Sequence, residues 1–199
     1  LLPVDIPQMA GYDISGASEP ARHVGGDYFD VLKLSDSKLL VCIADVVGKG
    51  MSAALLMSNI QATVKTLATA IISPKQLCER ANRIISNNTS SDKFITFFAG
   101  VLDSTNSRFT YVNAGHNPPI VFRPNGSEQL LDAGGAVLGV FEDGSYEQGE
   151  VSLSVGDRIL LYTDGVTEAM SPTGEEFSEG RLIDLVKNTA TTSAAELQH

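Results

Sequence analysis

The stretch Ile43-Ala44-Asp45-Val46-Val47-Gly48-Lys49-Gly50-Met51 decides how the rest of the chain is interpreted. Residues 39–46 form an almost unbroken apolar run of strand length, which predicts a buried strand with Asp45 near its end. An ionised carboxylate in that place is costly to desolvate unless a cation meets it. Gly48 and Gly50 let the backbone bend sharply before a helix begins. A strand that delivers a carboxylate to a glycine turn at a helix N-terminus predicts a site for a metal ion or a phosphate group.

A second acid stands at the start of the preceding predicted strand. Asp27 follows two glycines, and residues 28–34 continue as strand. The pair Asp36-Ser37 is typical of a turn, so this strand and the strand that carries Asp45 are expected to form a hairpin. The hairpin brings Asp27 and Asp45 side by side at one end of a sheet. Because neighbouring carboxylates repel each other, the pair implies a cation between them.

A third acid, Asp164, repeats the pattern of Asp45: an apolar strand, an aspartate at its end and a glycine that starts a turn. Read alone, an Asp-Gly pair after a strand is typical of a simple turn. Three acids at the ends of buried strands favour a shared metal site instead. Oxygen ligands without a Cys or His cluster suit a hard divalent cation, Mg²⁺ or Mn²⁺, which keeps several waters and leaves room for a phosphate.

The remaining pattern predicts an α+β fold. Helices are expected from about residue 52 to 70 and from Pro74, where Ser73 is the N-cap. Short turns join consecutive strands downstream, which is typical of antiparallel sheets and not of parallel βαβ units. We therefore expect two antiparallel sheets packed on each other with the helices outside. Besides the hairpin, the expected strands are residues 11–17, 96–103, 108–114, 119–122, 128–131, 146–153 and 158–162.

The composition excludes several classes of protein. The 199 residues, of which 43% are hydrophobic and 19% charged, suit one globular domain. A net charge of −10 argues against nucleic acid as the main ligand, since that binding rests on basic surface. No apolar run approaches the ~20 residues that cross a bilayer, and no signal peptide is recognised. We therefore expect a cytoplasmic protein without direct membrane contact, in which Cys42 and Cys78 are reduced and buried.

A histidine, His116, lies in the stretch Asn113-Ala114-Gly115-His116-Asn117-Pro118-Pro119. One interpretation is a metal ligand or a proton donor. The other is a residue that shapes the loop through satisfied hydrogen bonds, which is the commoner role for a histidine among Gly, Asn and Pro. We favour the loop-shaping role.

Four stretches occur in the order and approximate spacing of a known phosphatase family: Gly25-Gly26-Asp27, residues 44–50, residues 113–119 and residues 163–169. On these motifs the chain resembles the bacterial metal-dependent Ser/Thr protein phosphatases of PP2C type, in their sporulation and stress-response branch. The similarity spans nearly the whole chain. It implies a four-layer α-β-β-α sandwich with a binuclear Mn²⁺ or Mg²⁺ centre between the sheets. We expect the domain at residues 9–199, after the end of a linker at residues 1–8.

The resemblance implies roles for four residues. Asp45 corresponds to the carboxylate that bridges the two metal ions, and the carbonyl of Val46 to a further ligand. Asp164 corresponds to a ligand of one metal ion, and Asp27 to the acid that binds metal directly or through its water shell. In the family, a water held between the metal ions attacks the phosphorus of phosphoserine or phosphothreonine without a phosphoenzyme. Two cations lower the pKa of such a water and neutralise charge on the phosphoryl oxygens.

Two more residues are candidates beside this centre. Arg22 is the nearest candidate for holding the phosphate, because a guanidinium pairs well with phosphoryl oxygens; an ordinary surface arginine is the equal alternative. Glu168 either supports Asp164 from outside the site or caps a helix, and we favour the first. The chain also departs from the branch, because Lys49 stands where a histidine is usual and His23 where a glutamate is usual.

A larger departure concerns the C-terminus. Family members continue past the last helix into a strand with an Asp-Asp-x-Thr pattern, whose acid completes the second metal position. This chain stops at His199, just after Ser193 and Glu196 start a helix. We therefore expect the domain to be truncated at that strand and one metal site to be incomplete.

The resemblance also implies a function and partners. The chain is expected to be the phosphatase domain of a longer protein with an N-terminal sensor. It would hydrolyse phosphoserine or phosphothreonine on a small STAS-type antagonist protein and so free a sigma factor, and a homodimer is common in this branch. One alternative is a pseudophosphatase that binds a phosphoprotein without turnover, and another is an enzyme for small phosphoesters.

Overall fold

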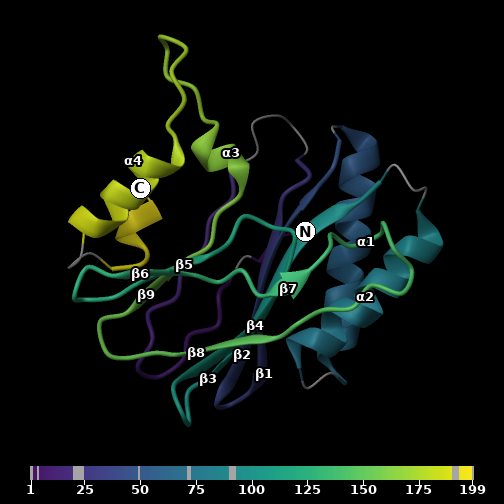
Figure 1. Cartoon of the computed structure of the whole chain (residues 1–199), viewed down its shortest axis with the longest axis horizontal. Coiled ribbons are helices and arrows are strands. Elements are labelled where there is room, and N and C mark those ends of the chain that lie inside the picture. The colour runs from purple at the N-terminus through teal and green to yellow at the C-terminus, as the bar shows by residue number, and fades with distance from the viewer. Residues whose placement is uncertain are drawn as a thin grey trace.

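The computed structural model in Figure 1 describes residues 2–3, 5–19, 25–48, 50–70, 73–89, 93–189 and 193–198. The described chain begins with a β-hairpin, continues with two long helices and seven further strands, and ends with short helices. The elements are β1 (Tyr28–Ser35), β2 (Lys38–Val46), α1 (Met51–Ala68), α2 (Pro74–Asn88), β3 (Ile95–Asp103), β4 (Arg108–Ala114), β5 (Ile120–Phe122), β6 (Glu128–Leu130), β7 (Gly134–Gly135), β8 (Gly149–Ser152), β9 (Arg158–Leu160), α3 (Asp164–Thr167), α4 (Glu179–Asn188) and the 3-10 helix Glu196–Gln198.

The strands form two sheets. The larger one has the order β1-β2-β3-β4-β7, with β8 also paired to β4, and the smaller one has the order β6-β5-β9. All pairs are antiparallel except β4 with β7. The expectation of purely antiparallel sheets is therefore wrong at this edge. A Cβ atom on Gly134 would lie only 1.7 Å from the carbonyl oxygen of Asn113, so the two backbones meet there because glycine has no side chain.

The strand expected at residues 11–17 is also wrong. In this segment the structure has only an isolated bridge between Met9 and Tyr12. The Gln8 side chain donates to the carbonyl of Ile14 at 2.7 Å and accepts from its N–H at 3.3 Å. A side chain thus satisfies the backbone groups that a neighbouring strand would otherwise pair.

The two long helices confirm their sequence signals. The helix predicted at about residues 52–70 is α1, and its side chains Ile60 and Val64 are buried. The side chain of Ser73 caps α2 by accepting from the N–H of Gln76 at 3.3 Å. Among the described residues, no helix combines the length and the apolar character that a membrane span requires.

Three clusters of buried side chains join these elements. The first packs α1 and α2 against the larger sheet, with Ile60 on α1 and Phe97 on β3. The second joins the larger sheet to the smaller one, through residues such as Phe98 and Val121. The third contains Val186 of α4 and covers the smaller sheet. Accordingly, α4 and the pair α1 and α2 lie at opposite sides of the molecule in Figure 1. The predicted α+β class is confirmed.

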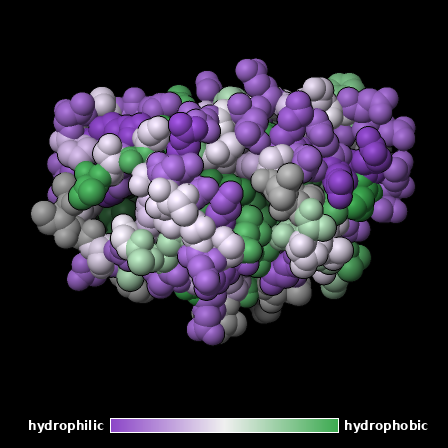
Figure 2. All heavy atoms as spheres, turned by 90° about the horizontal axis from the view of Figure 1, so that it is seen from below, coloured by the Kyte–Doolittle hydropathy of each residue, from purple (hydrophilic) through white to green (hydrophobic). Residues whose placement is uncertain are grey.

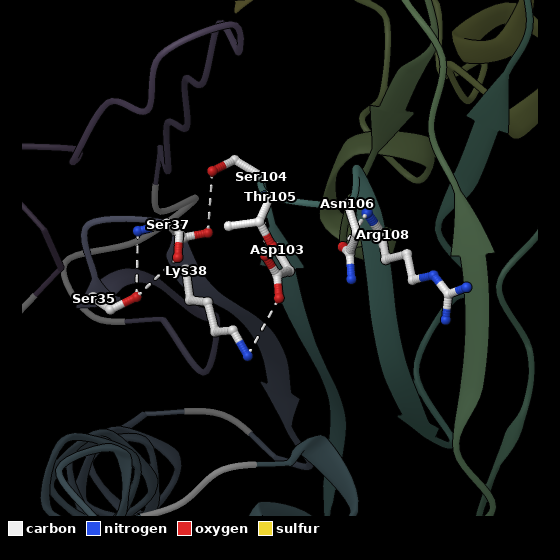
Figure 3. Close-up of polar contacts among 8 residues, drawn as sticks. All are labelled: Ser35, Ser37, Lys38, Asp103, Ser104, Thr105, Asn106 and Arg108. Carbon is white, nitrogen blue, oxygen red and sulfur yellow. Dashed lines mark hydrogen bonds and ion pairs between the residues drawn. The ribbon is translucent and has the colours of Figure 1, made fainter.

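Polar turns pin the register of the larger sheet at the end away from Asp45. Lys38 on β2 pairs with Asp103 on β3 at 3.3 Å, and the Ser104 hydroxyl donates to the Ser37 carbonyl at 3.3 Å (Figure 3). The backbone N–H of Ser104 donates to the same carbonyl at 2.9 Å. Strand pairing from this point places Asp45 opposite Thr96. Seen from below, this part of the surface is mostly polar, with small apolar patches (Figure 2). A one-residue slip would turn every side chain to the other face, so the turns help to fix where Asp45 points.

Candidate functional site

The β1–β2 hairpin brings the first two acids together. Tyr28 pairs with Ala44, so Asp27, one residue before the strand, comes beside Asp45. A Cβ atom on Gly26 would lie 2.8 Å from the Val46 carbonyl oxygen and 3.2 Å from a carboxylate oxygen of Asp45. Glycine is required for this approach, since real Cβ atoms do not come so close to an oxygen. The hairpin predicted from the sequence is confirmed.

The third acid reaches the same place from the end of the smaller sheet. Asp164 is the first residue of the short helix α3. The hydroxyl of Thr163, its neighbour, donates to Asp27 Oδ2 at 3.2 Å. A Cβ atom on Gly165 would lie 3.6 Å from that same oxygen. Segments 136 residues apart in the sequence thus place Asp27, Asp45 and Asp164 in one electrostatic neighbourhood.

Burial raises the pKa of two of these carboxyl groups, Asp45 and Asp27. Burial, together with the charges of Asp27 and Asp164, raises the pKa of Asp45 to about 7. A hydrogen bond with Asp27 also favours the protonated form of Asp45, whereas the Val46 N–H opposes it. Burial raises the pKa of Asp27 as well, against its hydrogen bonds with Thr163 and Asp45. Without a cation, the pair Asp27 and Asp45 therefore shares a proton near neutral pH.

The oxygen donors of this site suit a hard cation, although the described side chains do not form a complete set of ligands. Carboxylates and the Val46 carbonyl are oxygen donors, which Mg²⁺ and Mn²⁺ prefer. Across the described ranges, no three His, Cys, Asp or Glu side chains converge closely enough to form a complete ligand set. An incomplete protein shell suits an ion that keeps several water ligands. The residues present therefore fit the proposed ions in donor type and charge.

The loop after Asp45 has the conformation that its glycines predict. Gly48 has φ +105° and Gly50 φ +78°, a region that favours glycine. The carbonyl of Gly50 accepts from the Ala54 N–H at 3.1 Å, and α1 begins at Met51. The amino group of Lys93 lies 3.6 Å from the Cβ position of Gly48. No motif in the sequence pointed to this lysine.

Of the other residues that the sequence analysis singled out near the acids, the structure describes Glu168 but not Arg22, His23 or Lys49. The side chain of Glu168 is exposed, and its backbone N–H donates to the carbonyl of Asp164 at 2.7 Å at the C-cap of α3. Glu168 thus caps the helix with its backbone, and a supporting role for its carboxylate stays a prediction.

Within its loop, His116 is buried, and both of its ring nitrogens and its backbone N–H have hydrogen-bond partners. His116 is 4% exposed, and its backbone N–H donates to the side chain of Asn113 at 2.7 Å. Its ring nitrogens contact the Thr96 hydroxyl and the Tyr162 carbonyl. The satisfied hydrogen bonds expected of a loop-shaping histidine are confirmed. The sequence did not point to Thr96 or to the Tyr162 carbonyl, because a threonine in a strand and a backbone carbonyl leave no motif. Thr163 lies within a motif, but its bond to Asp27 was not predicted.

Comparisons with known proteins identify relatives of this chain. The model of the family "Stage II sporulation protein E (SpoIIE)" matches residues 35–199. The phosphoserine phosphatase RsbU of Bacillus subtilis (strain 168) is 37% identical over 175 residues, which are 87% of this chain and 52% of that protein. The chain thus spans about half the length of this curated relative.

Two solved structures have the same fold. The structure of the RsbU and RsbW domains of Rv1364c from Mycobacterium tuberculosis gives a TM-score of 0.73 at 30% identity, covering 87% of this chain and 49% of that one. The PP2C phosphatase domain of SpoIIE from Bacillus subtilis, solved with a fragment of its regulatory domain, gives 0.72 at 20% identity, covering 88% and 51%. With the motifs, the fold and the family match in agreement, the chain belongs to the SpoIIE family of PP2C-type phosphatase domains, in the branch that contains RsbU.

Proposed function

We propose that this chain is a Mn²⁺- or Mg²⁺-dependent phosphatase that hydrolyses phosphoserine or phosphothreonine on a protein. The observation that carries the proposal is that Asp27 and Asp164, from distant segments, both act electrostatically on Asp45, whose pKa is raised to about 7 by burial and by these charges. Such an excess of negative charge is costly in a half-buried site unless a cation occupies it. The relationship to a phosphoserine phosphatase supports the same reaction.

The residues of this chain would have separate roles in the reaction. Asp45, Asp164 and the Val46 carbonyl would hold the ions, and Asp27 would hold one directly or through water. Two such ions supply a nucleophilic water and neutralise phosphoryl charge. The Thr163 hydroxyl occupies Asp27 Oδ2 and so limits how that carboxylate turns. No side-chain nucleophile is needed, and the buried thiols Cys42 and Cys78 are poor candidates because burial raises the pKa of both.

Two further roles follow the resemblance. Arg22 would hold the phosphoryl oxygens, since a guanidinium matches them in charge and geometry. Glu168 would support Asp164 with its carboxylate. We also propose that the three apolar clusters separate four layers, α-β-β-α, with the ions between the two sheets.

The proposed substrate is a phosphorylated STAS-type antagonist of an anti-sigma factor, and the proposed setting is a longer, dimer-forming protein with an N-terminal sensor. The similarity to a phosphatase named RsbU and to a protein that joins RsbU and RsbW domains supports this assignment.

The test is Mn²⁺-dependent release of phosphate from a phosphoserine STAS-type protein, with Asp45→Asn as the comparison. We expect release that needs metal and is lost in Asp45→Asn. A phosphopeptide and a nucleotide, tested in parallel, separate a protein phosphatase from an enzyme for small phosphoesters. Binding of the phosphoprotein without release of phosphate, at saturating Mn²⁺, would favour the pseudophosphatase.

A further inference from the structure

The imidazole of His116 lies between the two segments that carry Asp45 and Asp164. Its Nδ1 is 2.9 Å from the hydroxyl of Thr96, which is the register partner of Asp45 and lies 3.4 Å from the Asp45 carbonyl oxygen. Its Nε2 is 3.2 Å from the carbonyl oxygen of Tyr162, two residues before Asp164. One side chain therefore links the larger sheet to the strand end that delivers the third acid.

These contacts define the tautomer of the ring. A carbonyl oxygen only accepts hydrogen bonds, so Nε2 of His116 carries the hydrogen toward Tyr162. Burial lowers the pKa of His116 to about 4, against the opposing influence of the Tyr162 carbonyl and the Asp164 charge. In the neutral ring Nδ1 is the acceptor, and the Thr96 hydroxyl donates to it.

Loop shape alone does not account for the ring. Asn113 fixes the turn through the backbone of His116: its side chain accepts from the His116 N–H at 2.7 Å and donates to the His116 carbonyl at 2.9 Å. Gly115 supplies the positive φ of +70°. These bonds involve no atom of the imidazole. Both nitrogens of the ring instead contact residues near the acids, namely Thr96 on β3 and Tyr162 just after β9.

We propose that His116 is a positioning residue, which sets the spacing between Asp45 and Asp164 by linking Thr96 to the Tyr162 carbonyl across the two sheets. This inference rests on the proposed function, because the spacing matters through the ions that the acids hold. The ring touches neither substrate nor metal in this role. Groups that orient ligands in this way typically change metal affinity or activity by roughly 10–100-fold when removed.

The test compares His116→Ala with two milder variants. His116→Gln can replace both hydrogen bonds, with an amide N–H toward Tyr162 and an amide oxygen toward Thr96. Thr96→Val keeps the volume and strand propensity of Thr96 but removes the hydroxyl. Mn²⁺ affinity and kcat are measured for each, together with thermal unfolding. We expect His116→Ala to lose at least tenfold in both, with KM unchanged, Thr96→Val to lose less, and His116→Gln to recover most of the loss.

Asn82→Ala is the matched control. Asn82 is 1% exposed and makes three hydrogen bonds, to Gly139, Phe141 and Glu142, all in a loop that carries none of the three acids. Asn82→Ala should lower the unfolding temperature, while its Mn²⁺ affinity and kcat stay within about twofold of those of the unaltered chain. The proposal is overturned if His116→Ala behaves in the same way, or if His116→Gln recovers nothing.

A second measurement separates this inference from the proposed function. In the metal-free chain, long-range ¹⁵N–¹H spectra should show His116 with its hydrogen on Nε2 in the unaltered chain, and a shifted Nδ1 signal in Thr96→Val. A hydrogen on Nδ1 instead would overturn the bridge, whether or not the chain is a phosphatase. The chain could also give the expected spectrum but neither bind Mn²⁺ nor release phosphate. That result would support the hydrogen-bonded bridge, and it would overturn both the proposed function and the role of His116 in spacing metal ligands.

Discussion

Replacing Asp45 by Asn should stabilise the metal-free chain at alkaline pH while it abolishes phosphate release. The asparagine mimics the protonated carboxyl group, which can still form the hydrogen bond with Asp27. The substitution therefore removes the cost of ionising a half-buried acid beside two others without leaving a cavity. If Asp45 served only to stabilise the fold, Asp45→Asn would instead lower the free energy of unfolding.

The magnitude follows from the pKa of Asp45. A rise from 3.8 to about 7 corresponds to an upper bound of about 4 kcal/mol on the cost of the ionised form. The site is only half-buried, so solvent screening reduces the expected gain to roughly 1–2 kcal/mol.

The pH dependence has a definite sign. Because the pKa of Asp45 is higher in the folded chain, the folded state binds more protons than the unfolded state between pH 3.8 and about 7. The stability from this group is therefore present at low pH and lost as the pH rises through 7. Asp45→Asn lacks this loss, so the two chains should be equally stable near pH 4 and differ most above pH 8.

The assay is urea unfolding in EDTA at a series of pH values, for both chains. Mn²⁺ should then stabilise the unaltered chain and leave Asp45→Asn unchanged. Equal stability of the two chains at every pH would refute the reasoning, as would a less stable Asp45→Asn at pH 8. Either result would mean that Asp45 is solvated or already paired with a cationic side chain.

Three other substitutions test separate parts of the structure. Gly26→Ala places a methyl group 2.8 Å from the Val46 carbonyl oxygen, so it should weaken Mn²⁺ binding in a calorimetric titration, whereas Gly180→Ala, in open space, should not. Arg22→Ala should lower kcat/KM in phosphate release by at least tenfold with Mn²⁺ affinity unchanged, and Arg22→Lys should recover part of the lost kcat/KM. An equal loss in both variants would argue against a phosphate contact. Lys65→Met should destabilise the fold by about 1–3 kcal/mol in urea unfolding, because the carboxylate of Asp30, 2% exposed, loses its partner at 3.2 Å; unchanged stability would show that the pair contributes nothing.

The parts of the site that sequence could predict are those held by local pairing. The turn at Asp36-Ser37 fixes the hairpin, and the hairpin fixes the neighbourhood of Asp27 and Asp45. The position of Asp164 depends on how one sheet packs on the other, so its own pattern predicted only the end of a strand, and the three acids had to be considered together to favour a shared site. The error at residues 11–17 has a similar cause, because Gln8 satisfies backbone groups of Ile14 that periodicity assigns to a neighbouring strand.

The same distinction explains why His116 was predicted only in part. Its local role, a turn held by Asn113, follows from the residue types around it. Its long-range role involves Thr96, 20 residues earlier, and Tyr162, 46 residues later. The charges of Asp27 and Asp164 act on Asp45, and the described residues give the acids no complete ligand set, so contacts around the acids contribute to their spacing. A neutral, buried imidazole with both nitrogens bonded can hold that separation without adding charge to the site.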